Sequence, residues 1–81
     1  MFCIYVLKSE RNGKRYVGSS SKPAEIRLCE HNSGTNVFTR HNKPWKLIHQ
    51  EKFATKVEAL RREKFLKSGQ GRKWLDENVR A

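Results

Sequence analysis

The sequence has little acidic charge and no long hydrophobic run. Eight acidic residues stand against 18 basic ones in a chain of 81 residues, which gives a formal net charge of +10. No apolar run approaches the roughly 20 residues that span a bilayer. The apolar stretch over residues 2–7 is too short for a signal peptide and has no cleavage pattern after it. We therefore expect a cytoplasmic protein with no membrane contact.

Cysteine is also scarce. The only two cysteines, Cys3 and Cys29, match neither a metal-ligand spacing nor a disulfide framework. We interpret both as small buried hydrophobic residues in a reducing compartment. The three histidines, His31, His41 and His49, follow no zinc-ligand spacing either, which disfavours a zinc site.

Positive charge is what the sequence has in excess. The sequence pI is about 10.1, and hydrophobic residues make up 36% of the chain, enough for a compact fold. So much charge on a short chain predicts a polyanionic partner, and nucleic acid is the natural one. A basic surface that serves only solubility is the alternative. The length predicts a single domain over residues 1–81, and we find no repeat, linker or low-complexity tract.

The N-terminal quarter of the sequence is typical of a β-hairpin. Two β-rich runs, over residues 2–9 and 14–20, surround the dipeptide Asn12-Gly13. Asn-Gly is the strongest short signal for a hairpin, because both residues tolerate a positive φ. We therefore expect two antiparallel strands joined by a two-residue turn.

This turn fixes a predicted register. Tyr5 would lie opposite Ser20, and Tyr16 would emerge on the same face of the sheet as Tyr5. The two tyrosines would be offset by four residues, on the order of 13 Å along the strand. We expect them to line one cleft without touching.

The rest of the chain predicts helices and one further strand. Trp45, Leu47 and Phe53 alternate on one face of that strand, and Thr55 with Glu58 forms a capping box at the start of a helix. The fold class is α+β, a small three-stranded antiparallel sheet flanked by helices in the order β-β-α-β-α-α. The expected segments are a helix over 23–33, a loop over 35–43, a strand over 44–53, a helix from 55, a break over 68–71 and a helix over 72–79.

A carboxylate interrupts the apolar stripe of the second predicted helix. At 100° per residue, Ala59, Leu60 and Leu66 share one stripe, and Glu63 falls inside it. A carboxylate at the edge of an apolar face is unfavourable unless a positive group meets it. A cation is one such partner, and an ion pair with Lys67 one turn later is the alternative.

Four motifs resemble those of the GIY-YIG nuclease family. "CIYVLKS" and "RYVGSS" resemble its paired strand motifs, "IRLCEHNSG" its helix with an arginine and a histidine, and "EALRREKFLK" its glutamate-bearing helix. The resemblance extends over the whole chain, which is similar to the short stand-alone bacterial members of the family. By this resemblance, the catalytic positions of the family fall on Tyr5, Tyr16, Arg27, His31 and Glu63.

The resemblance implies a metal-dependent endonuclease that hydrolyses phosphodiester bonds of nucleic acid. DNA rather than RNA is the expected substrate, and DNA repair or recombination the expected process. Glu63 would hold Mg²⁺ or Mn²⁺, which stabilises the charge on the phosphorane or on the leaving oxygen. The fork of Arg27 would bind a phosphate oxygen. Tyr5 or His31 would take the proton of the attacking water, and Tyr16 would orient a donor toward the phosphate.

The chain departs from the family pattern at three positions. Cys3 replaces the glycine of the first motif, and Ser19 stands where some relatives carry lysine. An asparagine near the end of some relatives has no clear counterpart, and we do not transfer its role to Asn78.

A set of basic residues predicts a track for backbone phosphates rather than a reader of base sequence. Ordinary solvated charge is the alternative for any one of them. Sequence specificity would then come from a protein partner or from the shape of the substrate. The residues of this predicted track are Arg40, His41, Lys43, Arg61, Arg62, Lys64, Arg72 and Lys73.

Each candidate also has a purely structural interpretation. The two strand tyrosines are explained by packing alone, Arg27 by an ion pair with Glu30, and His31 by the dipole of its own helix end. The alternative function is accordingly a basic nucleic-acid-binding module without catalysis. Glu63 favours the enzyme, because a binding module gains nothing from a carboxylate in its cleft.

Overall fold

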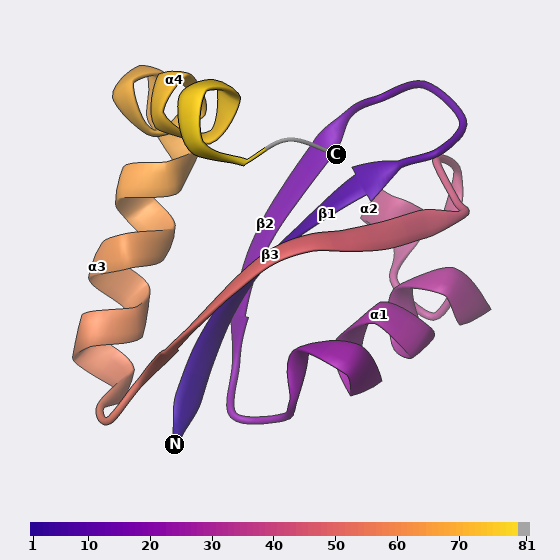
Figure 1. Ribbon diagram of the computed structural model, residues 1–81. Helices are drawn as coiled ribbons and strands as arrows, with labels where there is room; N and C mark the ends of the chain where they lie inside the picture. Colours follow the sequence, from indigo (N-terminus) through magenta and orange to yellow (C-terminus); the bar gives the residue numbers. More distant parts are fainter. Residues whose placement is uncertain (80–81) are drawn as a thin grey trace.

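The computed structural model describes residues 1–79, which form a three-stranded antiparallel sheet with helices on both faces (Figure 1). The strand order is β2-β1-β3, so β1 is central and β2 is an edge strand. This confirms the predicted α+β class. The elements are β1 (Phe2–Ser9), β2 (Arg15–Ser20), α1 (Ala24–Ser33), α2 (Val37–Arg40), β3 (Trp45–Phe53), α3 (Lys56–Lys67) and α4 (Gly69–Asn78).

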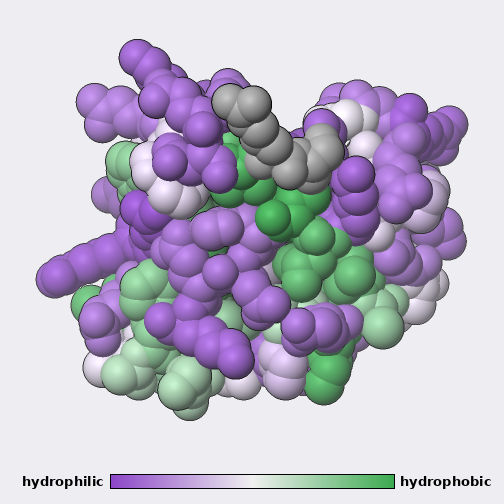
Figure 2. Space-filling view, in the orientation of Figure 1, coloured by the Kyte–Doolittle hydropathy of each residue, from purple (hydrophilic) through white to green (hydrophobic). Residues whose placement is uncertain are grey.

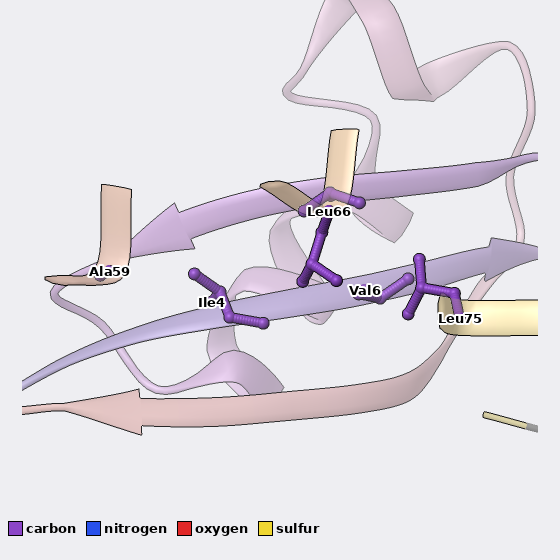
Figure 3. Packing of buried hydrophobic residues seen from close by; sticks show 6 residues of the cluster. Ile4, Val6, Ala59, Leu66 and Leu75 are labelled. Carbon is purple, nitrogen blue, oxygen red and sulfur yellow. The ribbon is translucent and has the colours of Figure 1, made fainter. Parts of the chain in front are cut away.

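One face of β1 packs against α3 and α4. Ile4 and Val6 point toward Leu66 of α3 and Leu75 of α4 (Figure 3), and all four are almost completely buried together with Ala59. Because strand side chains alternate between faces, the residues between them point the other way. Cys3, Tyr5 and Leu7 therefore form a second cluster, on the face that α1 covers, with Ala24 and Trp45.

The predicted two-residue turn is wrong. The backbone N–H of Ser9 donates to the carbonyl of Lys14 at 2.8 Å, which leaves a four-residue loop between them. The Ser9 hydroxyl accepts hydrogen bonds from the N–H groups of Arg11 and Asn12 at 3.1 and 3.2 Å. These local bonds favour the wider loop, because they satisfy backbone donors that a tight turn would satisfy with the facing strand.

The wider loop moves the register by two residues. Tyr5 pairs with Gly18, not with Ser20. Because the shift is an even number of residues, Tyr16 still lies on the same face as Tyr5, as predicted.

A bulge in β3 overturns a second prediction. The register of β3 against β1 shifts beside Leu7, which pairs with Leu47, and Ile48 is the extra residue. An extra residue reverses the alternation beyond it. Trp45 and Leu47 accordingly share the α1 face, whereas Phe53 packs on the α3 face.

Four other expectations also differ from the structure. The segment 35–43, predicted as a loop, contains the short helix α2, and the predicted break over 68–71 is shorter, because α4 begins at Gly69. Cys29 is exposed, since it lies about 100° around α1 from the half-buried Leu28. Leu60 is 45% exposed, on the flank of α3 next to the sheet edge.

None of the helices within residues 1–79 is both long enough and sufficiently apolar to span a membrane. Hydrophilic side chains cover much of the face drawn in Figure 2, in keeping with the charge of the chain.

The junction of α3 and α4 depends on a buried glycine. Ser68 ends α3 and caps α4, where its hydroxyl accepts the N–H of Gly71 at 3.1 Å. A Cβ on Gly71 would collide with the carbonyl oxygen of Phe65 and the Cα of Leu66. Only glycine therefore lets the two helices approach this closely.

We predict that Gly71→Ala lowers the free energy of unfolding by about 2 kcal/mol or more, since backbone atoms must move to admit the methyl group. For a domain of this size, the melting temperature should fall by roughly 8 °C or more. Gly69→Ala is the matched control, because no atom lies within 4 Å of the position that a Cβ would take there. Equal melting temperatures for the two variants would contradict the close approach.

Candidate active site

Tyr5 crosses over Gly18 on the neighbouring strand. A Cβ at Gly18 would lie 2.5 Å from the Tyr5 hydroxyl oxygen and 3.1 Å from Cε2 of Tyr16. Such distances leave no room for any side chain at this position. The glycine of the "RYVG" motif thus explains how the buried ring of Tyr5 can extend over β2.

The Tyr5 hydroxyl lies in a chain of hydrogen bonds. It accepts from Nε of Arg27 at 3.3 Å and lies 3.0 Å from Nε2 of His31, whose Nδ1 is 2.8 Å from the hydroxyl of Thr39. Arginine can only donate, so the proton of Tyr5 is left for His31, and we assign Nδ1–H of His31 as the donor to Thr39. The chain is consistent only with a neutral imidazole.

The electrostatics agree with this assignment. Burial lowers the pKa of His31, and the positive charge of Arg27 lowers it further. Burial raises the pKa of Tyr5, although the hydrogen bond from Arg27 opposes this. A neutral phenol and a neutral imidazole at pH 7 follow. The dipole interpretation of His31 needs a cation and is therefore not supported.

The two tyrosines are closer than predicted. Their ring centroids are 6.3 Å apart, and the ring of Tyr16 lies 4.9 Å from that of His31. The expected offset of about 13 Å is wrong because it rested on the two-residue turn. Tyr5 and His31 are fully buried, whereas Tyr16 is half-buried and forms the outer part of the cluster.

Arg27 joins this cluster to the surface. Besides its bond to Tyr5, it makes the ion pair with Glu30 that the structural interpretation expected. The hydrogen bond from Lys22, together with that from Arg27, outweighs desolvation and holds the pKa of Glu30 below its ordinary value. With 27% of its side chain exposed, Arg27 is both anchored and accessible.

Glu63 lies on the other face of β2. One carboxylate oxygen accepts the hydroxyl of Ser19 at 2.6 Å, and the other is 2.8 Å from Nζ of Lys67. Partial burial alone would raise the pKa of Glu63, but the bonds from Lys67 and Ser19 outweigh it and the pKa is lowered. The carboxylate is therefore ionised at neutral pH, with 17% of the side chain exposed.

The edge strand separates the two parts of the candidate site. The Tyr5 hydroxyl contacts β2 at Gly18, and Glu63 contacts β2 at the next residue, Ser19. Because consecutive strand residues face opposite sides, the tyrosine cluster and Glu63 lie on opposite sides of β2 at the same point along the strand. The structure thus brings together Tyr5, Tyr16, Arg27 and His31, and places Glu63 across the strand from them. A group that lies over the edge of β2 has access to both sides.

Comparison with known proteins identifies the family of the chain. The family model described as the GIY-YIG catalytic domain matches residues 1–75. The chain belongs to the GIY-YIG family. This is a nuclease family, and its nucleases act on nucleic acid.

Similar curated proteins carry the name UPF0213 protein, which states no activity. The chain is 39% identical to one from Staphylococcus saprophyticus over 66 residues, which covers 80% of this chain and 78% of the relative. It is 44% identical to one from Enterococcus faecalis over 63 residues, 74% of this chain and 69% of the relative.

The departures from the GIY-YIG motifs have local explanations. Cys3, in place of the motif glycine, is buried and donates its thiol to the carbonyl of Lys22 at 3.3 Å, so packing absorbs the change. Ser19, in place of lysine, binds Glu63 directly. No sequence pattern indicated this role or that of Thr39. Asn78 donates to the carbonyl of Trp74 in its own helix.

The predicted phosphate track is not uniform. Arg62 differs from the rest, because it makes a bidentate pair with Glu51 at 2.8 and 3.1 Å and lies 4.5 Å over the ring of Trp74. This arrangement ties α3 to β3 and α4. The exposed members are Arg40, His41, Lys43, Arg61, Lys64, Arg72 and Lys73.

We predict that His31 titrates below its ordinary pKa of 6.5 in the folded chain. Its folded-state pKa is lowered, so the stability it supports is present above pH 6.5 and is lost as the pH falls through the folded-state pKa. Histidine-detected NMR titration gives the midpoint, and denaturant unfolding from pH 7 to 5 gives the loss. A midpoint above 6.5 would mean a stabilised imidazolium and would contradict the assigned hydrogen-bond chain.

Proposed function

We propose that the chain is a metal-dependent nuclease that hydrolyses phosphodiester bonds of DNA at the edge of β2. The observation that carries the proposal is the placement of an ionised carboxylate, Glu63, across one edge strand from an anchored arginine, Arg27. Phosphodiester hydrolysis needs both kinds of group, one to hold a cation and one to meet the anionic phosphate. A binding module needs only the second.

The residues around Glu63 fit a hard cation of the Mg²⁺ type. Mg²⁺ prefers oxygen ligands, keeps several waters and is commonly held by one or two carboxylates together with substrate phosphates. Among residues 1–79, no group of three or more acidic, histidine or cysteine side chains is placed to hold a metal. Glu63, supported by the hydroxyl of Ser19, would therefore hold Mg²⁺ or Mn²⁺ with oxygens of the substrate. When bound, the cation neutralises charge that develops on the phosphate oxygens.

The ion pair with Lys67 does not conflict with this role. The Lys67 side chain is 53% exposed, and exposed pairs of this kind contribute less than about 1 kcal/mol. Its Nζ holds one carboxylate oxygen of Glu63 while the hydroxyl of Ser19 holds the other. A divalent cation competes favourably with a single exposed ammonium group, so the metal would displace Nζ of Lys67 from the carboxylate of Glu63.

Arg27 is placed to meet the phosphate. Tyr5 holds its Nε and Glu30 its Nη1, so the guanidinium is oriented before a substrate arrives. A preoriented donor stabilises developing charge without reorganisation. We assign Tyr5 and His31, which are buried, to holding Arg27 and Tyr16 in position, and Tyr16 to orienting the groups at the phosphate.

Glu63→Gln should abolish cleavage and weaken the binding of Mn²⁺, while affinity for DNA stays the same or rises slightly. The amide keeps an acceptor for Ser19 but removes the charge that holds the cation and repels phosphate. The measurements are cleavage of a panel of labelled single-stranded, branched and duplex DNA with Mg²⁺, Mn²⁺ or chelator, and Mn²⁺ binding by calorimetry. Normal cleavage together with easier unfolding would make Glu63 a structural partner of Lys67.

Arg27→Lys should lower the cleavage rate by about 10²-fold, because lysine keeps the charge but loses the fork that acts on the transition state. Affinity for DNA should change by less than about 3-fold. The control is Arg11→Lys, at an exposed arginine that donates to the carbonyl of His41, and it should cleave normally. Equal losses of rate and affinity in Arg27→Lys would make this residue an ordinary phosphate contact.

A further inference from the structure

A groove with a volume of about 480 Å³ lies between β2 and the helices α3 and α4. Its basic lining residues are Lys14, Arg15, Lys67 and Arg72. Of these, only Arg72 belongs to the phosphate track predicted from the sequence. Lys67 also contacts Glu63 at 2.8 Å, so the groove begins one helical turn from that carboxylate.

The floor of the groove is apolar. Val17 of β2, Leu66 of α3 and Leu75 of α4 line it, and they belong to the core cluster on the α3 face. Tyr16 also borders the groove, and its ring lies 4.9 Å from that of His31 in the tyrosine cluster on the other face of β2. Val17, Leu66 and Leu75 are themselves at most 8% exposed, but the lining as a whole is mostly apolar beneath its cationic rim, and such a lining suits a ligand that has both anionic groups and apolar surface.

A second hollow, of about 200 Å³, lies toward the other end of β2. It is lined by Ser19, Ser20, Lys56 and Leu60, among others. Ser19 lines this hollow and donates a hydrogen bond to Glu63. This hydrogen bond therefore lies between the second hollow and the groove. From Arg15 to Ser20, β2 extends about 17 Å, which is the approximate length of the seam with α3.

We propose that this seam binds one single strand of nucleic acid, with its phosphates on Lys14, Arg15, Lys67 and Arg72 and its bases or sugars on the apolar floor. The choice of nucleic acid rests on the proposed function, and it defines the substrate at the Glu63 site as single-stranded. A duplex keeps its base faces stacked inside and would leave the apolar floor without a partner. A single strand presents both surfaces and passes Glu63 as it follows β2.

Two of the cations have acidic partners in the free protein. Arg15 is 2.8 Å from Asp76, whose side chain is 66% exposed, and Lys67 contacts Glu63. In each pair one partner is more than half exposed, so solvent weakens the attraction and a phosphate can compete for the cation. Asp76 lies beside the rim and opposes phosphate binding by its charge, so its removal should strengthen binding.

The test measures affinity for a fluorescent oligothymidylate in chelator, where no cleavage occurs. The groove variant combines Lys14→Gln with Arg72→Gln, and the control combines Lys46→Gln with Lys52→Gln, two exposed lysines of β3. Both variants lose the same charge. We expect the groove variant to bind about 10-fold more weakly, with a log–log salt slope smaller by about 1.4, and the control to stay within about 2-fold. Equal affinities in the two variants would overturn the proposal.

A gain of binding provides a second readout that misfolding cannot imitate. Asp76→Asn should bind the oligothymidylate about 3-fold more tightly, because Arg15 loses its competitor and the rim loses a negative charge. Unchanged or weaker binding would count against the groove. A loss of affinity in the groove variant that is just as large for a blunt duplex would overturn the single-strand assignment.

These outcomes are independent of the nuclease proposal. Weak binding by the groove variant, with no cleavage of any substrate by the natural sequence, would support the groove and refute the nuclease. Cleavage that depends on Glu63, with equal binding by the groove and control variants, would support the nuclease and refute the groove.

Discussion

The close approach of Tyr5 to Gly18 is the constraint on which the candidate site depends. With no side chain at Gly18, the ring of Tyr5 crosses the neighbouring strand and its hydroxyl reaches Arg27 and His31. A single methyl group at this position would lie 2.5 Å from that hydroxyl oxygen. The chain of hydrogen bonds to Thr39, and with it the orientation of the half-buried Arg27, follows from this one contact.

The edge position of β2 gives the site its second half. Successive residues of a strand point to opposite faces, so chemistry on two faces can meet only where the sheet ends. Ser19 holds Glu63 at this edge, and α3 is fixed in place by the buried Leu66 and by the bidentate pair of Arg62 with Glu51. The carboxylate is therefore held by the packing of its helix as much as by its own hydrogen bonds.

The sequence predicted the fold class and the order of the main elements, but not the distances between the candidate site residues. Periodicity correctly placed Glu63 beside the buried Ala59 and Leu66, although Leu60 of the same predicted stripe is 45% exposed, and alternation correctly placed Tyr5 and Tyr16 on one face. The separation of the tyrosines was wrong because it depended on the loop, where the hydroxyl of Ser9 accepts the backbone N–H groups of Arg11 and Asn12 and stabilises a wider turn. The extra residue Ile48 reversed which side chains of β3 face each side of the sheet beyond the bulge. The alternation of residues in the sequence does not show where such a bulge occurs.

The most direct test of the central claim, that both faces of β2 act on one phosphate, is paramagnetic mapping by NMR. Mn²⁺ is added to the ¹⁵N-labelled chain with a phosphorothioate oligonucleotide that resists cleavage. We predict selective broadening of the amide signals of Ser19 and Glu63 on one side of β2, and of Tyr16 and Arg27 on the other, only when the oligonucleotide is present with the metal. Broadening confined to the exposed carboxylates, such as Asp76, would contradict the claim.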